Sequence, residues 1–298
     1  MIAWKSAVCL LAAVSLCVMA GCSDSDSDTD TDSVSDSSQS DSEDADSDDS
    51  EEQTESDEES EAEEYSAGDK LTAAAELFSG DYTYTASVSY SDDESTVTEV
   101  TLVSYGDKVY QKAVSSGSEG LQTNAVYLFD GSTAYAADLN LGVYSQTDER
   151  ENLNTVLSVI DAELENTATR ILNDEAYTYE EYTYTGSTYM SVFDFYFGED
   201  DSLEKYTVTY LRETEDDLVE TVEIGSIEQS VDESVFDSAL EGLESFDDFT
   251  EDERLGFCQN ICSEYSVSTD DMYTLDITTD DFKTISFDDF TTLIYTFA

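Results

Sequence analysis

Between residues 82 and 229, polar and apolar residues alternate in a series of separate runs. In the run YTYTASVSY, every second residue is apolar and the residues between them are Thr or Ser. A period of two is typical of a β-strand with one buried face. Similar runs occur at residues 97–105, 108–114, 125–129, 133–138, 169–172, 176–185, 188–197, 203–212 and 218–229. Turn sequences such as YGD and FDGS between these runs predict hairpins, and therefore antiparallel pairing.

The apolar period changes to three and four at two places, which predicts helices. Residues 70–78 form a short helix-like segment before the first strand, and it ends at Gly80. Residues 151–160 carry apolar side chains at spacings of three and four between the two sets of strands. This spacing predicts an amphipathic helix at that point.

The hexamer SFDDFT occurs twice near the C-terminus, at residues 245–250 and 286–291. Its Ser-x-x-Asp spacing is that of a helix N-cap, and Thr250 to Glu253 has the same spacing ahead of ERLGFCQNICSEY. We therefore expect helices to begin at Ser245, Thr250 and Ser286. A duplicated recognition motif is the alternative interpretation.

Three stretches of the strand region resemble a known family. They are VYLFDGSTAYAADLNLGVYSQ, FDFYFGEDDSLEKYTVTY and IEQSVDESVFDS, at residues 126–146, 193–210 and 227–238. Their pattern is similar to that of the LolA-like or LppX-like bacterial envelope lipoproteins and carriers. The resemblance covers residues 69–243. It implies a mainly β (α+β) fold, in which a strongly curved antiparallel sheet forms a half-barrel with a few covering helices.

The same resemblance implies an apolar interior that accepts lipid acyl chains or another hydrophobic ligand, without catalysis. The candidate ligand face consists of seven apolar or aromatic residues, namely Tyr82, Tyr84, Val88, Phe193, Phe195, Val208 and Tyr210. The alternative is that these side chains pack against the covering helices and bind nothing.

Residues 1–21 have the layout of a bacterial export signal. Lys5 precedes an apolar run that is too short to span a bilayer, and small residues follow the run. The sequence Met-Ala-Gly-Cys that ends at Cys22 resembles a lipobox, which implies that this cysteine is diacylated and becomes the mature N-terminus. Two acyl chains are sufficient for stable anchoring. An ordinary secretory signal or a short buried helix is the alternative.

The segment after Cys22 is acidic. Residues 23–64 contain 21 Asp or Glu and no Lys or Arg. Such a segment buries too little apolar surface to fold, so we expect a disordered tether over residues 22–68. A spacer that holds the folded part away from the membrane is the first interpretation, and weak binding of calcium ions is the second.

The composition excludes several classes of function. A net charge of −62 opposes binding to nucleic acid. The absence of histidine excludes Ser-His-Asp and Cys-His catalysis and the usual zinc sites. A pair of carboxylates could hydrolyse glycosides, but among 72 acidic residues no pair stands out. We expect no enzyme activity, no cofactor and no metal site.

Cys258 and Cys262 are the only thiols predicted in the mature chain besides Cys22. They lie four residues apart on one face of a predicted helix. We expect them to be buried as small apolar side chains, with a strained disulfide as the second candidate.

These observations divide the chain into a signal peptide (1–21), a lipidated tether (22–68), a LolA-like sheet domain (69–243) and a helical C-terminal extension (244–298). The predicted function is a non-enzymatic lipoprotein at the extracytoplasmic face of the cell membrane that binds a lipid or another hydrophobic ligand. The alternative is a structural or interaction module with a fully packed core, whose partner is another envelope protein.

Overall fold

A computed structural model describes residues 68–116, 121–148, 159, 163–173, 175–185, 190–212 and 216–298. Its twelve strands are β1 (Tyr82–Tyr90), β2 (Asp93–Tyr105), β3 (Lys108–Ser116), β4 (Asn124–Phe129), β5 (Ala134–Asp138), β6 (Val143–Thr147), β7 (Glu163–Leu172), β8 (Glu175–Thr185), β9 (Met190–Phe197), β10 (Leu203–Leu211), β11 (Leu218–Glu228) and β12 (Glu244–Ser245). Its helices are α2 (Asp69–Glu76), α4 (Ser234–Ser238), α5 (Glu251–Glu264), α6 (Thr269–Thr274), the 3-10 helix η1 (Asp281–Lys283) and α7 (Phe287–Phe297).

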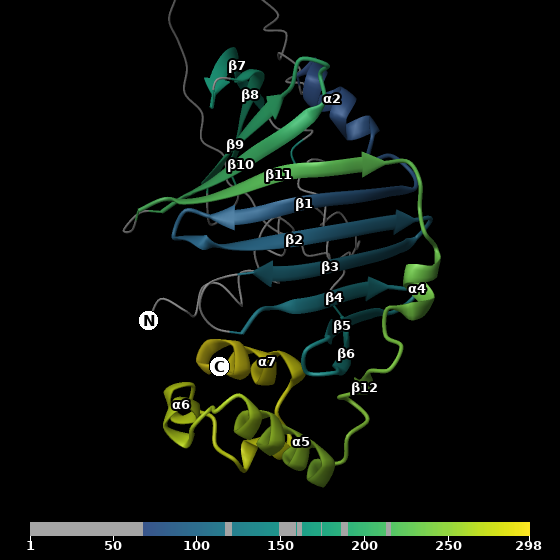
Figure 1. The fold of residues 1–298 in the computed structure, drawn as a ribbon, viewed down its shortest axis with the longest axis vertical. Helices are drawn as coiled ribbons and strands as arrows, with labels where there is room; N and C mark the ends of the chain where they lie inside the picture. The colour runs from purple at the N-terminus through teal and green to yellow at the C-terminus, as the bar shows by residue number, and fades with distance from the viewer. Residues whose placement is uncertain are drawn as a thin grey trace, which may run out of the picture. The chain divides into compact units, whose positions relative to one another are not determined.

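All twelve strands belong to one sheet, in the order β12-β6-β5-β4-β3-β2-β1-β11-β10-β9-β8-β7 (Figure 1). Neighbouring strands are antiparallel except for β12 and β6, which are parallel. Strands β12 and β7 form the two edges, so the sheet is not closed into a barrel. The predicted fold class, a mainly β protein with a large unclosed sheet and few helices, is confirmed.

The turn chemistry explains the hairpins. Between β4 and β5, the Asp130 carboxylate accepts hydrogen bonds from the backbone N–H groups of Ser132 and Thr133 and from the Ser132 hydroxyl. These bonds hold the pKa of Asp130 below its ordinary value. Gly131 has φ +96°, a conformation that L side chains rarely adopt. The sequence DGST therefore fixes this turn by side-chain hydrogen bonds and by glycine.

The alternating runs predicted from the sequence are strands in the structure, with differences at their ends. The run predicted to begin at residue 169 begins at Glu163, as β7. Strand β6 was not predicted, because its five residues follow a four-residue turn and include only two apolar ones. The helix predicted over 151–160 lies outside the described residues, apart from Val159.

The C-terminal helices begin at two of the three predicted caps. The Thr250 hydroxyl accepts from the backbone N–H of Glu253 at the start of α5, and Ser286 does the same with Asp289 at α7. The prediction of a helix start at Ser245 is wrong. Ser245 lies in β12 and pairs with Tyr144, and the next backbone N–H, that of Phe246, donates to the carbonyl of Tyr144. Since strand pairing holds this backbone extended, the helix begins only at Thr250.

Buried residues gather on both sides of the sheet and at one edge. Helix α2 packs on one side, which we call the α2 face, and α4 packs on the other side, which we call the α4 face. The C-terminal helices form a third cluster with Leu141 and Val143 of the β5–β6 hairpin, next to the β12 edge (Figure 1).

Candidate ligand-binding face

The α2 face is built from alternate residues of six adjoining strands. Its buried members on the sheet are Tyr82, Tyr84, Ala86, Leu102, Tyr182, Phe193, Phe195, Phe197, Leu203, Tyr206, Val208 and Val222. Leu71, Ala74 and Ala75 of α2 pack against them, with Phe78 just beyond the helix. Phe78 makes edge-to-face contacts with Tyr82 and Tyr84, at ring-centroid distances of 5.3 and 5.6 Å. Aromatic side chains therefore dominate this face.

All seven residues of the predicted ligand face lie in this cluster. Five of them are buried, namely Tyr82, Tyr84, Phe193, Phe195 and Val208. Val88 and Tyr210 are half-buried. The register places Val208 opposite Phe193, and Tyr210 opposite Ser191. The fold thus brings the candidate residues of β1, β9 and β10 onto one face.

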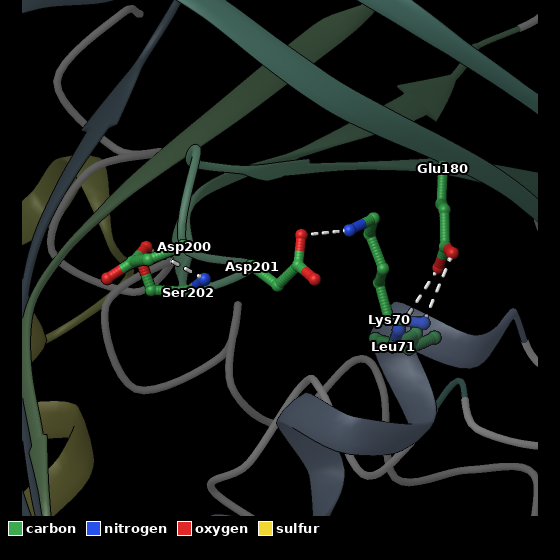
Figure 2. A network of polar contacts seen from close by, with 6 residues as sticks. All are labelled: Lys70, Leu71, Glu180, Asp200, Asp201 and Ser202. Carbon is green, nitrogen blue, oxygen red and sulfur yellow. Dashed lines mark hydrogen bonds and ion pairs between the residues drawn. The ribbon is translucent and has the colours of Figure 1, made fainter.

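A buried glutamate holds the first turn of α2 against the sheet (Figure 2). The Glu180 carboxylate of β8 accepts from the backbone N–H of Leu71 at 3.1 Å and of Lys70 at 3.4 Å. The Tyr182 hydroxyl donates to Glu180 at 2.8 Å and accepts from the N–H of Gly68 at 2.8 Å. Because the first N–H groups of a helix have no partner within it, this carboxylate serves as a cap supplied by another strand.

A second contact ties α2 to the hairpin between β9 and β10. The Lys70 ammonium forms an ion pair with Asp201 (Figure 2). Asp201 has φ +66°, and the turn around it is closed by Asp200, whose carboxylate accepts from the Ser202 N–H and hydroxyl. These bonds hold the pKa of Asp200 below its ordinary value. Helix α2 is therefore attached through its backbone to a buried acid and through Lys70 to a surface acid.

A second buried glutamate, Glu220 of β11, lies on the same face and has different partners. The Tyr210 hydroxyl donates to Glu220 Oε2 at 3.0 Å, and the Tyr90 phenol is also hydrogen-bonded to this carboxyl. Glu220 is 8% exposed. Burial raises its pKa from 4.5 to about 7, although the two phenols oppose the rise. Close to neutral pH, Glu220 thus exists in both its charged and its uncharged form.

Ser191 of β9 completes a polar group on this part of the α2 face. It is 1% exposed, and its Oγ has no hydrogen-bond partner among the described residues. Its strand neighbour is Tyr210, whose hydroxyl is bonded to Glu220. Buried hydroxyl groups in proteins are normally paired, so an unpartnered one calls for an explanation.

The α4 face carries a polar network around Tyr179. The Tyr179 hydroxyl contacts the carboxylates of Glu181 and Asp194, the latter at 2.7 Å, and Arg170 lies 3.7 Å from the centre of its ring. Burial and the two acids raise the pKa of Tyr179. Each charged group here is paired with another group of the network, which indicates a structural role.

Cys258 and Cys262 are both buried in the C-terminal cluster, and both are free thiols. Burial raises the pKa of Cys258 to about 12 and that of Cys262 to about 11. A thiol with such a pKa is a poor nucleophile and metal ligand near neutral pH. In the described residues no cluster of three or more acidic, cysteine or histidine side chains is arranged to hold a metal ion.

A cavity of about 500 Å³ lies among the C-terminal helices. Its lining includes Leu275, Ile277, Asp281 and Asp289. Both acids are engaged at helix starts, Asp281 with Thr278 and Asp289 with Ser286. The two carboxylates of this cavity are therefore used by the fold itself.

Comparison with known proteins finds similarity to solved structures. No protein-family model matches the chain, and no curated protein matches it. The chain is similar to the crystal structure of a LolA superfamily protein from Nitrosomonas europaea. The two are 11% identical over 57% of this chain and 97% of the other, with a TM-score of 0.25. The unclosed sheet itself is defined by its strand order and pairing. Among the described residues, no helix is long and apolar enough to cross a membrane.

The sequence analysis did not single out Glu180, Glu220 or Ser191. The sequence nevertheless held a signal for each of them. Residues two positions apart in a strand share a face, and the residues that share a face with these three are mostly apolar or aromatic. Glu220 stands between Leu218 and Val222, and Ser191 precedes the alternate phenylalanines of β9. In a chain with 72 acidic residues, parity distinguishes a buried acid from a solvated one.

Proposed function

We propose that this protein is a lipid-anchored, extracytoplasmic binding protein for a lipid or another hydrophobic molecule, that the ligand lies against the α2 face, and that the protein is not an enzyme. The observation that supports the proposal is the size of the aromatic face relative to the helix packed on it.

Helix α2 has eight residues, which corresponds to a length of about 12 Å. Strand β1 has nine residues and is about 30 Å long, and the six strands of the face span about 24 Å across the sheet. The described residues that pack onto this face from outside the sheet are those of α2, together with Phe78 and Val159. The half-buried residues Val88 and Tyr210 mark the part where we place the ligand.

The location is proposed from the sequence around Cys22, which lies outside the described residues. Two acyl chains on this cysteine would attach the chain to a membrane, and the net charge of −62 opposes any further attraction to anionic lipid. We infer that the acidic segment after Cys22 keeps the sheet away from the membrane surface.

The ligand proposal is tested on the full chain purified in mild conditions. Native mass spectrometry should find a copurifying apolar molecule, and solvent extraction should release it. Tyr210→Trp, which enlarges the side chain where we place the ligand, should reduce its occupancy. Tyr273→Trp, at an exposed position of α6, is the matched control and should not.

The competing proposal is a packed interaction module, and the burial of five of the seven candidate residues favours it. If the purified chain carries no apolar molecule and takes none up from lipid vesicles, the module is the better description.

The anchoring proposal is tested separately. Cys22→Ser should release the protein into the medium or leave the precursor uncleaved, whereas Cys17→Ser, in the apolar run, should leave processing unchanged. If Cys22→Ser remains processed and partitions into detergent as before, the chain is not anchored through this residue.

A further inference from the structure

Three polar side chains from neighbouring strands meet on the α2 face away from α2. Ser191 of β9 lies opposite Tyr210 of β10 in the strand register. Tyr210 reaches diagonally to Glu220 of β11, and 3.0 Å separates its hydroxyl from Oε2. Tyr210 and Glu220 are thus hydrogen-bonded to each other, whereas the Ser191 hydroxyl has no partner within the described part of the chain.

The surroundings of this group are apolar. Val208 lies opposite Glu220 on β10, and Phe193 lies opposite Val208 on β9. Ser191 is 1% exposed and Glu220 is 8% exposed. Valine at these positions would bury more apolar surface and leave no polar atom unpaired, so packing alone does not account for a serine and a glutamate here.

We propose that Glu220, Tyr210 and Ser191 form a recognition point for the polar head of an amphiphilic ligand, and that this head is an uncharged hydroxyl-bearing group such as glycerol. The inference rests on the proposed function, because the apolar chain of the same ligand would lie along the aromatic part of the α2 face. It adds the chemical class of the ligand.

The partners of Glu220 favour a hydroxyl group. With a pKa of about 7, the carboxyl is partly protonated near neutral pH and can both donate and accept a hydrogen bond. The Ser191 hydroxyl can do the same, and so can a ligand hydroxyl. A hydroxyl of the ligand would therefore supply the partner that Ser191 does not find among the described residues.

An anionic head does not fit this point. Burial and two phenols account for the shifted pKa of Glu220, and no lysine or arginine of the described chain contributes to it. A carboxylate or phosphate placed here would face Glu220 without a neutralising cation. The net charge of −62 would also repel an anion at longer range.

The test uses the full chain with the neutral fluorescent probe N-phenyl-1-naphthylamine bound. Three lipids with the same chain then compete with the probe: 1-monolauroylglycerol, laurate and dodecylamine. We expect monolauroylglycerol to displace the probe at a concentration about tenfold lower than laurate, the effect of about one well-formed hydrogen bond. Equal competition by laurate, or stronger competition by dodecylamine, overturns the assignment of the head group.

Two variants locate the effect. Ser191→Ala and Tyr210→Phe should each lower the affinity for monolauroylglycerol about tenfold. The affinity for N-phenyl-1-naphthylamine should stay unchanged, since this probe lacks a hydroxyl. Tyr135→Phe is the matched control, because it removes a phenol from the α4 face, and it should change neither. Ser191→Ala removes a hydroxyl that makes no hydrogen bond to the residues that the structure describes, so the variant should fold. If Ser191→Ala binds monolauroylglycerol as the wild type does, the recognition point is elsewhere.

The outcomes separate the inference from the proposed function. If the chain binds neither the probe nor any of the three lipids, the proposed function fails and the inference fails with it. If it binds all three lipids equally, the proposed function stands and the head-group inference alone is overturned.

Discussion

The α2 face and the C-terminal helical cluster are both buried, but they are built from different residues. The helical cluster consists mainly of Phe, Leu, Ile and the two cysteines, and four of its phenylalanines are buried. The α2 face includes four buried tyrosines, and Glu180, Glu220 and Ser191 lie on the same side of the sheet. The helical cluster shows that this chain can build a core with few polar atoms. The polar groups on the α2 face therefore need a reason other than packing.

Glu180 and Glu220 show that these polar groups are of two kinds. Glu180 binds two backbone N–H groups and a phenol, so its carboxylate is fully used in holding α2. In the described chain the hydrogen-bond partners of Glu220 are phenols, and its pKa is raised to about 7. We assign Glu180 to the fold and Glu220 to the ligand.

The largest effect is expected in the helical cluster. Phe290 is fully buried, and its ring centroid lies 5.9 to 6.1 Å from those of Phe246, Phe257 and Phe282. Phe290→Ala should lower the free energy of unfolding by about 4 kcal/mol, measured by urea denaturation, because it removes a large ring and leaves a cavity. Stabilisation by added monolauroylglycerol should persist in this variant and be lost in Phe195→Ala. A loss in both would remove the contrast between the two regions.

Replacing each buried glutamate by glutamine should change the free energy of unfolding at pH 8 in opposite directions. Folded Glu220 holds its proton to a higher pH than the unfolded chain does, so stability falls as pH rises from 4.5 to about 7. The full effect is about 3 kcal/mol. Glu220→Gln should match the wild type below pH 4.5 and be about 3 kcal/mol more stable at pH 8.

Glu180→Gln is the matched comparison. An amide offers one accepting oxygen where the carboxylate offers two, and its NH₂ group would face the donors of Lys70, Leu71 or Tyr182. We expect it to be about 2 kcal/mol less stable at pH 8. Denaturation curves at pH 4.5 and pH 8 measure both variants. If both variants changed the free energy of unfolding at pH 8 in the same direction, the assignment of Glu180 to the fold and Glu220 to the ligand would be contradicted.

The strands were predictable because alternation is a local property of the sequence. In β1 and β9 the apolar residues stand at every second position, so the buried face of each strand can be identified from that strand's own sequence. The error at Ser245 has a non-local cause, since a capping sequence was overruled by pairing with Tyr144, about a hundred residues earlier. Local spacing does not contain such a contact.

The candidate face was predictable in part for the same reason. Parity places all seven aromatic or aliphatic candidates together, as the structure does. The hydrogen bond between Tyr210 and Glu220 depends on the register of β10 and β11, which the sequence does not state. The sequence therefore indicated which face to examine, and the register was needed to find its polar group.

The thiols test whether the helical cluster is a plain core. Cys258 and Cys262 should not react with Ellman's reagent in the native protein, because both are buried and their pKa values are raised to about 12 and 11. In urea, the chain should show two more reactive thiols than a Cys258→Ala/Cys262→Ala double variant. An equal count in urea would mean that the pair is oxidised. Cys258→Ala alone should lower the free energy of unfolding by about 1 kcal/mol.

The smallest effect is expected at the surface contact of α2. The Lys70 and Asp201 side chains are 24% and 69% exposed, and exposed ion pairs contribute little. Lys70→Ala should lower the free energy of unfolding by about 0.5 kcal/mol, and the difference should shrink in 1 M NaCl. Lys283→Ala, which removes a positive charge with no ion pair in the described residues, controls for the change in net charge. Since the backbone N–H groups of residues 70 and 71 still bind Glu180 in Lys70→Ala, α2 should stay attached. A loss as large as that of Glu180→Gln would mean that the surface pair, and not the buried acid, holds the helix on the α2 face.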